Sequence, residues 1–110
     1  MFEGERIRYI KGMFADIAKT KVMESLRPAV IVNLDCDLYG STVDALEMIK
    51  PKMQQGTVMM MDDYNAFCAA PDKGQRRALK EFLEKYPAVE AESWFPYSHV
   101  GQAFILHVVS

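Results

Sequence analysis

Three aspartates lie directly after two short apolar runs and could hold a metal ion together. Asp35 follows the run Ala29–Leu34, and the pair Asp62 and Asp63 follows the run Thr57–Met61. If the two runs are neighbouring parallel strands, about 4.8 Å apart, these carboxylates meet at one edge of the sheet. Carboxylates so close raise one another's pKa unless a cation neutralises them, and Mg²⁺ prefers oxygen ligands. The spacing therefore predicts a site for Mg²⁺ or another divalent cation at Asp35, Asp62 and Asp63.

Two further residues are candidates for proton transfer at this site. Asp37 lies two residues beyond Asp35, on the same face by the period of a strand but one step further out. A carboxylate there could stay off the cation and accept a proton as a general base. His99, in the loop between the last two predicted strands, could reach the same edge as a second base or a substrate contact. The alternative interpretation is that the aspartates only cap the helices that follow the strands.

The elements that must hold these residues alternate between strand and helix. Strands are predicted at Arg6–Ile10, Ala29–Leu34, Thr57–Met61, Ala91–Phe95 and Ala103–Val109. Helices are predicted over Phe14–Leu26, from a capping box at Ser41, Thr42 and Asp44 to Pro51, and from a cap at Asp72 to Pro87.

This order of elements indicates the class of fold. Strands as short and apolar as the two central runs are typical of a sheet covered on both faces. The last two strands are joined by a loop too short for a crossover helix, so they should be antiparallel. We expect a single α/β domain over residues 1–110, with a Rossmann-like, mostly parallel sheet, helices on both faces and a C-terminal antiparallel hairpin.

Composition excludes several classes of partner. The 110 residues are 50% apolar and 25% charged, which fits one compact domain. With 13 basic and 15 acidic residues the chain lacks the basic surface that binds nucleic acid. No apolar run approaches the roughly 20 residues of a membrane span, and the charged start is unlike a signal peptide. Two cysteines without metal-ligand spacing complete the prediction of a cytoplasmic protein with no membrane partner.

The acidic motifs resemble those of a known family. The string Asp-Cys-Asp-Leu-Tyr-Gly-Ser-Thr at residues 35–42, followed by Gln-Gly at 55–56 and Asp-Asp-Tyr at 62–64, is similar to the macrocin O-methyltransferase family of antibiotic-sugar methyltransferases. The resemblance extends from Lys11 and Gly12 through the helix near Phe82.

The resemblance implies a class I S-adenosylmethionine-dependent O-methyltransferase. In that reading Asp35, Asp62 and Asp63 bind Mg²⁺, Asp37 is the general base, and the acceptor is a small hydroxylated molecule such as a sugar. The family's Gly-x-Phe-x-Asp stretch is matched by residues 12–16. The resemblance thus implies that Gly12, Phe14 and Asp16, together with Asp35, contact S-adenosylmethionine.

The chain departs from the family at its N-terminal side. The glycine-rich turn and the first two strands of class I methyltransferases have no counterpart in the sequence, so this is expected to be a partial methyltransferase domain. In the family's sheet order the strand Ala29–Leu34 pairs with the first of those strands. We therefore expect its edge to be covered by Arg6–Ile10 or by a second copy in a homodimer, and we expect the chain to bind S-adenosylmethionine poorly or not at all.

Three other functions remain open from the sequence. In a nucleotide-sugar glycosyltransferase, Asp35 and Asp37 would form the Asp-x-Asp motif whose metal bridges a diphosphate, which leaves Asp62 and Asp63 without a role. A receiver-like phosphoacceptor domain would suit the length, but the last predicted strand contains no lysine. A truncated, non-catalytic binding or dimerisation module would show no turnover with any methyl donor.

Overall fold

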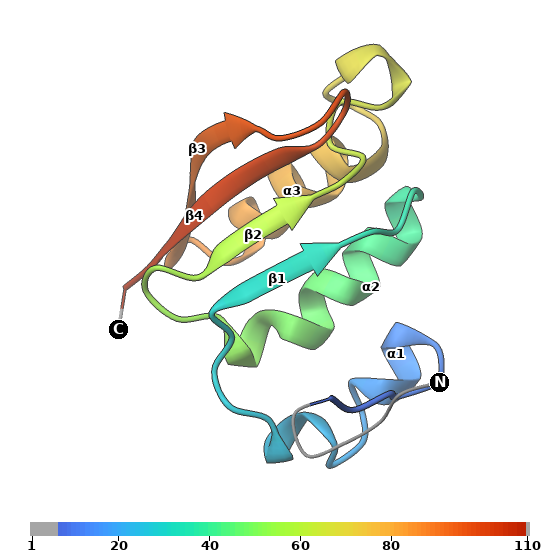
Figure 1. Ribbon diagram of the computed structural model, residues 1–110, viewed down its shortest axis with the longest axis vertical. Coiled ribbons are helices and arrows are strands. Elements are labelled where there is room, and N and C mark those ends of the chain that lie inside the picture. Colours follow the sequence, from blue (N-terminus) through green and yellow to red (C-terminus); the bar gives the residue numbers. More distant parts are fainter. Residues whose placement is uncertain (1–6, 110) are drawn as a thin grey trace.

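The computed structural model describes residues 7–109 and is built around one four-stranded sheet (Figure 1). The strands are β1 (Ile31–Leu34), β2 (Val58–Met61), β3 (Val89–Pro96) and β4 (Gln102–Val108), in the order β1-β2-β4-β3. β1 pairs with β2 in parallel, and β4 runs antiparallel to both β2 and β3. Because β4 opposes both neighbours, the other three strands point the same way. The predicted α/β fold, with its mostly parallel sheet and C-terminal antiparallel hairpin, is confirmed.

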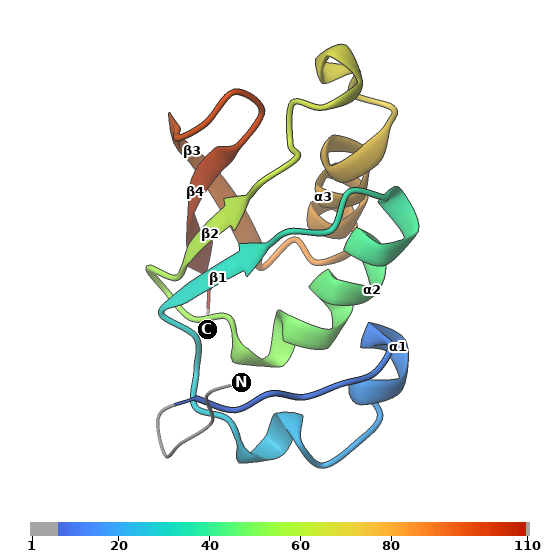
Figure 2. The same cartoon turned by 45° about the vertical axis from the view of Figure 1, so that its right-hand side comes forward.

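The helices of the described residues cover one face of this sheet. They are α1 (Phe14–Ile17), α2 (Tyr39–Ile49) and α3 (Gly74–Lys85), with short 3-10 turns at Met23–Ser25, Lys50–Lys52 and Phe67–Ala69. α2 and α3 lie side by side against the sheet, and α1 packs on α2 (Figure 2). The prediction of helices on both faces is therefore wrong for the part of the chain described. None of these helices is long and apolar enough to cross a membrane.

The core lies between the sheet and the two long helices. It contains Val32, Leu34, Met59, Met61, Phe104 and Leu106 from the sheet and Leu46, Leu79 and Phe82 from α2 and α3. Successive strand residues point to opposite faces, so the residues between them point away from the helices. Ile31, for example, is 64% exposed. The central runs are thus buried on one face only, against the prediction of cover on both.

The helix starts differ from the predicted ones because other contacts replace the expected caps. α2 begins at Tyr39, and Leu38 before it provides no side-chain cap. Thr42 is buried instead, and its hydroxyl donates to the Leu38 carbonyl at 2.9 Å. α3 begins at Gly74, without a side-chain hydrogen bond from Asp72 or Lys73. Both predicted caps, the Ser41 box and Asp72, are therefore wrong.

The N-terminal predictions also need correction. The expected helix Phe14–Leu26 is broken into α1 and a 3-10 turn, with no buried residue in α1 to hold a longer helix. In the expected strand Arg6–Ile10, Arg6 lies outside the described residues, and Ile7–Ile10 are exposed and contribute no strand to the sheet. β1 is therefore an edge strand within residues 7–109, and the expectation that this segment covers it is wrong.

Candidate functional site

An acidic cluster lies where β1 and β2 end. The register pairs Leu34 with Met61, so the acids that follow the two strands become neighbours. Carboxylate oxygens of Asp35, Asp37 and Asp63 all lie within 4.8 Å of one another. Asp35 and Asp37 are exposed, whereas Asp63 is half-buried. The arrangement of neighbouring parallel strands on which the metal prediction depended is present, and it brings residues from both acidic motifs together.

Asp62 is not among these three carboxylates and is hydrogen-bonded to a tyrosine. Its Oδ1 accepts a hydrogen bond from the hydroxyl of Tyr97, which lies in the loop between β3 and β4. Burial and this hydrogen bond raise the pKa of Tyr97 well above its ordinary value, so the phenol remains a donor. Of the three predicted ligands, Asp35 and Asp63 are therefore in the cluster, Asp62 is beside it, and the predicted base Asp37 is inside it.

Asp63 is the carboxylate of the cluster whose pKa is raised. Burial, then the adjacent carboxylate of Asp37 and the charges of Asp35 and Asp62, raise the pKa of Asp63 to about 6. Its Oδ2 is buried and has no hydrogen-bond partner among the described residues. A buried carboxylate oxygen without a donor, close to two other carboxylates, is the environment that a hard divalent cation satisfies. The residues present fit such an ion.

Gln75 connects the two acidic segments, and sequence reasoning missed it. It is fully buried in the first turn of α3, and its amide bonds to both acid-bearing segments. Nε2 donates to the carbonyls of Leu34 (3.1 Å) and Cys36 (3.0 Å), and Oε1 accepts from the Asp63 N–H (3.0 Å). Its spacing in the sequence could have indicated burial. Gln75 is three and four residues before the apolar positions Ala78 and Leu79, so it lies on the same face of the helix.

The predicted cofactor contacts are only partly brought together. Phe14 and Asp35 line a cavity of about 330 Å³ between α1, β1 and α2, whose other lining residues are mostly apolar. Gly12 lies against Ile17 instead, and neither it nor Asp16 is among the lining residues. His99 is exposed in the β3–β4 loop and is not in the acidic group. Tyr97, two residues earlier, makes the contact with the acids that was expected of His99.

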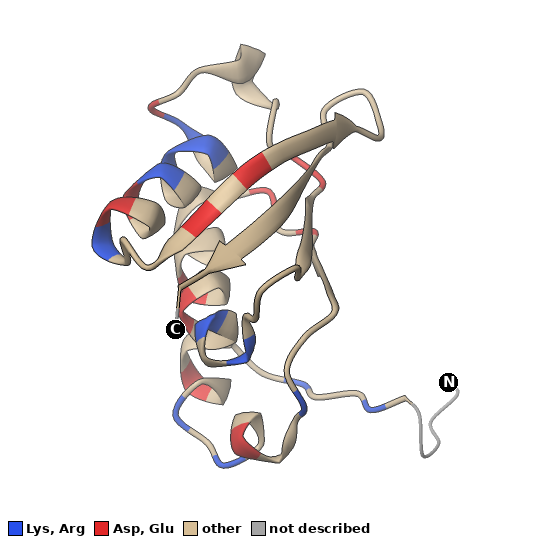
Figure 3. Ribbon diagram, turned by 90° about the vertical axis from the view of Figure 1, so that its left-hand side faces the viewer, with Lys and Arg blue, Asp and Glu red and all other residues tan. Residues whose placement is uncertain are grey.

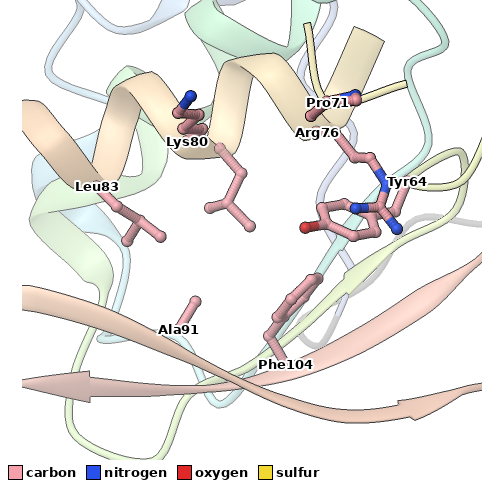
Figure 4. Close-up of a pocket in the computed structure, with 8 residues that line it drawn as sticks. Tyr64, Pro71, Arg76, Lys80, Leu83, Ala91 and Phe104 are labelled. Atoms are coloured by element: carbon pink, nitrogen blue, oxygen red, sulfur yellow. The ribbon is translucent and has the colours of Figure 1, made fainter. Parts of the chain in front are cut away.

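A second cavity, of about 290 Å³, lies between α3 and the hairpin (Figure 4). One of its lining residues is Tyr64, which directly follows Asp63 in the sequence. There the Arg76 guanidinium stacks 4.5 Å above the Tyr64 ring and donates to the Asn65 side chain at 2.6 Å. The Tyr64 ring meets Phe104 edge-on. The residue next to Asp63 is thus packed into the protein, which limits the freedom of the acidic turn.

Three basic residues of α3, Arg76, Arg77 and Lys85, make contacts within the chain. Figure 3 shows the basic positions along this helix, with acidic positions on the neighbouring strand β3. Arg77 forms an ion pair with Glu81 at 3.1 Å and stacks on Tyr39. Lys85 pairs with Glu47. These contacts favour a structural role for Arg77 and Lys85 over a site for an anionic substrate.

Comparison with known proteins agrees with the acidic motifs. The family model described as Macrocin-O-methyltransferase (TylF) matches residues 2–90. The demethyldecarbamoylnovobiocin O-methyltransferase of Streptomyces niveus is 35% identical over 60 residues, 54% of this chain and 22% of that protein. The mycinamicin III 3''-O-methyltransferase of Micromonospora griseorubida is 32% identical over the same shares of the two chains. The chain thus spans about a fifth of the length of these relatives.

Solved structures show the same fold. The O-methyltransferase NovP matches 76% of this chain and 34% of its own, with a TM-score of 0.53 and 23% identity. An O-methyltransferase from Bacillus cereus in complex with SAH matches 86% of this chain and 46% of its own, with a TM-score of 0.53 and 18% identity. At these identities the likeness establishes the fold alone, and it agrees with the α/β sheet described above.

Proposed function

The chain belongs to the macrocin O-methyltransferase family, and from this premise we propose that it is the metal-binding part of an S-adenosylmethionine-dependent, Mg²⁺-assisted O-methyltransferase. The proposed acceptor is a small hydroxylated molecule, most simply a sugar. The observation that carries this proposal is the acidic cluster, with three carboxylates within 4.8 Å of one another and a buried oxygen of Asp63 that no donor reaches within residues 7–109. A relative from Streptomyces olivaceus, 35% identical over 60 residues, adds support, because its name describes 4'-O-methylation of a rhamnosyl-tetracenomycin C.

In the proposed mechanism Asp35, Asp62 and Asp63 would hold the cation and Asp37 would take the proton. A bound Mg²⁺ supplies a Lewis acid that lowers the pKa of an acceptor hydroxyl. Asp37 is an exposed member of the cluster, and a carboxylate there could accept that proton as the oxygen attacks a sulfonium methyl group. Asp62 would have to exchange its hydrogen bond with Tyr97 for the cation.

The cavity beside β1 is the proposed position for part of the methyl donor. Phe14 and Asp35 are both among its lining residues, and an aromatic ring together with a carboxylate suits a positively charged sulfonium compound. Because Asp35 is shared between this cavity and the acidic cluster, donor and cation would lie next to each other. That proximity would suit transfer of a methyl group to an acceptor hydroxyl beside the acidic residues.

Calorimetry with Mn²⁺ as a probe tests the metal site directly. We expect wild-type protein to bind one Mn²⁺ per chain, and Asp63→Asn to lose that binding. Glu81→Gln is the matched control, since it removes an acidic charge from the exposed face of α3. Absence of Mn²⁺ binding by the wild type, or equal binding by Asp63→Asn, would contradict the proposal. Intact binding without methyl transfer to any sugar acceptor would favour the non-catalytic alternative.

A further inference from the structure

We propose that Gln75 is a positioning residue that sets the separation of the two acidic segments for cation binding, an inference that rests on the proposed function above. The backbone hydrogen bonds that pair β1 with β2 end before the acidic side chains. Beyond the pairing of Leu34 with Met61, the last backbone hydrogen bond between them runs from the Asp62 N–H to the Leu34 carbonyl, at 3.1 Å. The carboxylates lie after that point, so another group must fix their distance.

The Gln75 amide is hydrogen-bonded to both acidic segments, the one after β1 and the one after β2. Its two donor bonds go to the carbonyls of Leu34 and Cys36, which flank Asp35 in the sequence. Its acceptor bond holds the N–H of Asp63 itself. One side chain therefore connects the backbone around one proposed ligand to the backbone of another.

The chemistry of this contact selects the amide. A single side chain must donate two hydrogen bonds and accept one, in a place that water does not reach. An ionised glutamate could accept but not donate, and it would add a further negative charge to the cluster. An asparagine has the right atoms on a side chain one methylene shorter. Glutamine meets both the donor pattern and the reach.

The backbone of α3 holds Gln75 rigidly in place. Gly74 before it has φ +56°, a left-handed conformation that favours glycine, and a Cβ there would come within 2.9 Å of the Phe67 ring. Ala78 and Leu79, on the same face of the helix, are buried in the core. The amide is thus presented by a packed helix and not by a loop, which is what a positioning group needs.

Thr57 provides a matched control at the opposite end of the same two strands. It is also fully buried, and its hydroxyl donates to the Ala29 carbonyl at 2.7 Å and accepts from the Gln54 N–H at 3.0 Å. Thr57→Val removes a buried cross-connection between the segments of β1 and β2, as Gln75→Met does, but far from the acids. A purely structural role for Gln75 predicts that both variants lower the melting temperature and leave cation affinity unchanged.

The test measures Mn²⁺ affinity by calorimetry for wild type, Gln75→Met and Thr57→Val, with folding checked by circular dichroism. Groups that orient metal ligands typically contribute about 10-fold to 100-fold in affinity, so we expect Gln75→Met to raise the Kd by about that factor. Thr57→Val should stay within about twofold. Excess Mn²⁺ should saturate Gln75→Met but not Asp63→Asn, because only the latter lacks a ligand.

The outcomes separate this inference from the function on which it depends. If wild type binds Mn²⁺ and folded Gln75→Met binds it equally well, the role of Gln75 is refuted and the metal site stands. If wild type binds no Mn²⁺, both are refuted. Should Gln75→Met fail to fold, Gln75→Asn keeps a buried amide but cannot span the two segments, and the same loss of affinity is expected from it.

Discussion

Asp63 is the residue whose ionisation the fold opposes most among the described aspartates. Its pKa is raised from 3.8 to about 6, so the folded protein binds this proton more readily than the unfolded chain does. Stability from this group is therefore present below about pH 4 and is lost as the pH rises through 6. In the metal-free protein, the ionised Asp63 is a source of instability at neutral pH.

The corresponding prediction concerns Asp63→Asn without added metal. At pH 7.5 we expect it to melt a few degrees above wild type, with the difference shrinking toward pH 4, as scanning calorimetry over this range would measure. Adding Mn²⁺ should reverse the order, because a ligand at a hundredfold excess over its Kd stabilises by about 2.7 kcal/mol. A variant that melts below wild type at pH 7.5 without metal would contradict this account of the cluster.

Asp37 and Asp62 can be distinguished by their effects on binding and on turnover. The sequence assigns Asp62 to the cation and Asp37 to the proton, whereas the structure groups Asp37 with the other carboxylates and pairs Asp62 with Tyr97. We expect Asp62→Asn to weaken Mn²⁺ binding about tenfold or more. Asp37→Asn should bind within a few fold of wild type yet lose about 10² to 10⁴ in methyl transfer.

Tyr97→Phe tests whether Asp62 must give up its hydrogen bond with Tyr97 in order to bind the cation. It removes the hydroxyl that holds Asp62 while keeping the ring, so it should strengthen Mn²⁺ binding if Asp62 must leave Tyr97 to reach the cation. The opposite pattern, with Asp37→Asn losing the cation and Asp62→Asn keeping it, would make Asp37 the third ligand. Either result can be read by calorimetry in the absence of any acceptor.

At the scale of the elements, prediction from sequence succeeded where the signal was local. β1 and β2 were found because each is a short apolar run, and the acids after them follow from the geometry of parallel strands. It failed where the deciding partner is distant in the sequence. Ser41 has the residue type of a cap, but the fold begins α2 before it, and the importance of Gln75 depends on carbonyls about forty residues away.

The exposed edge of β1 leads to a prediction about self-association. The carbonyls of Val30 and Leu34 bond to β2, so the backbone groups of Ile31 and Asn33 point to the free edge. Unpaired edges of this kind invite pairing with another chain. We expect a homodimer through β1, and we expect Asn33→Pro to abolish it without unfolding the protein, because proline is tolerated at a strand edge.

Light scattering of wild type, Asn33→Pro and the control Asn33→Ala would measure this. Asn33→Ala keeps the backbone N–H and should remain dimeric. Hydrogen exchange adds a local readout, since the amides of Ile31 and Asn33 should be protected in the dimer and not in the proline variant. A monomeric wild type with rapid exchange at both amides would rule out the dimer.

For the whole molecule, the two proposed ligands should differ sharply in affinity. The acidic cluster proposed to hold the cation lies within the described residues, where carboxylate oxygens of Asp35, Asp37 and Asp63 are within 4.8 Å of one another. For S-adenosylmethionine, only two of the four predicted contacts, Phe14 and Asp35, share a cavity, and its volume of about 330 Å³ is at the small end of sites that enclose a ligand of drug size. One side of that cavity is β1, an edge strand of the sheet within the described residues.

Calorimetry on the 110-residue chain should therefore show Mn²⁺ binding but no micromolar binding of S-adenosylmethionine. Weak binding at higher concentration should fall further in Phe14→Ala, which removes the aromatic wall of the cavity, and should be unchanged in Tyr9→Ala, an exposed aromatic residue outside it. Micromolar affinity in the wild type would mean that the donor finds its main contacts elsewhere, for instance across the β1 edge of a dimer. In that case Asn33→Pro should remove donor binding while leaving Mn²⁺ binding intact, because the acidic cluster lies within one chain.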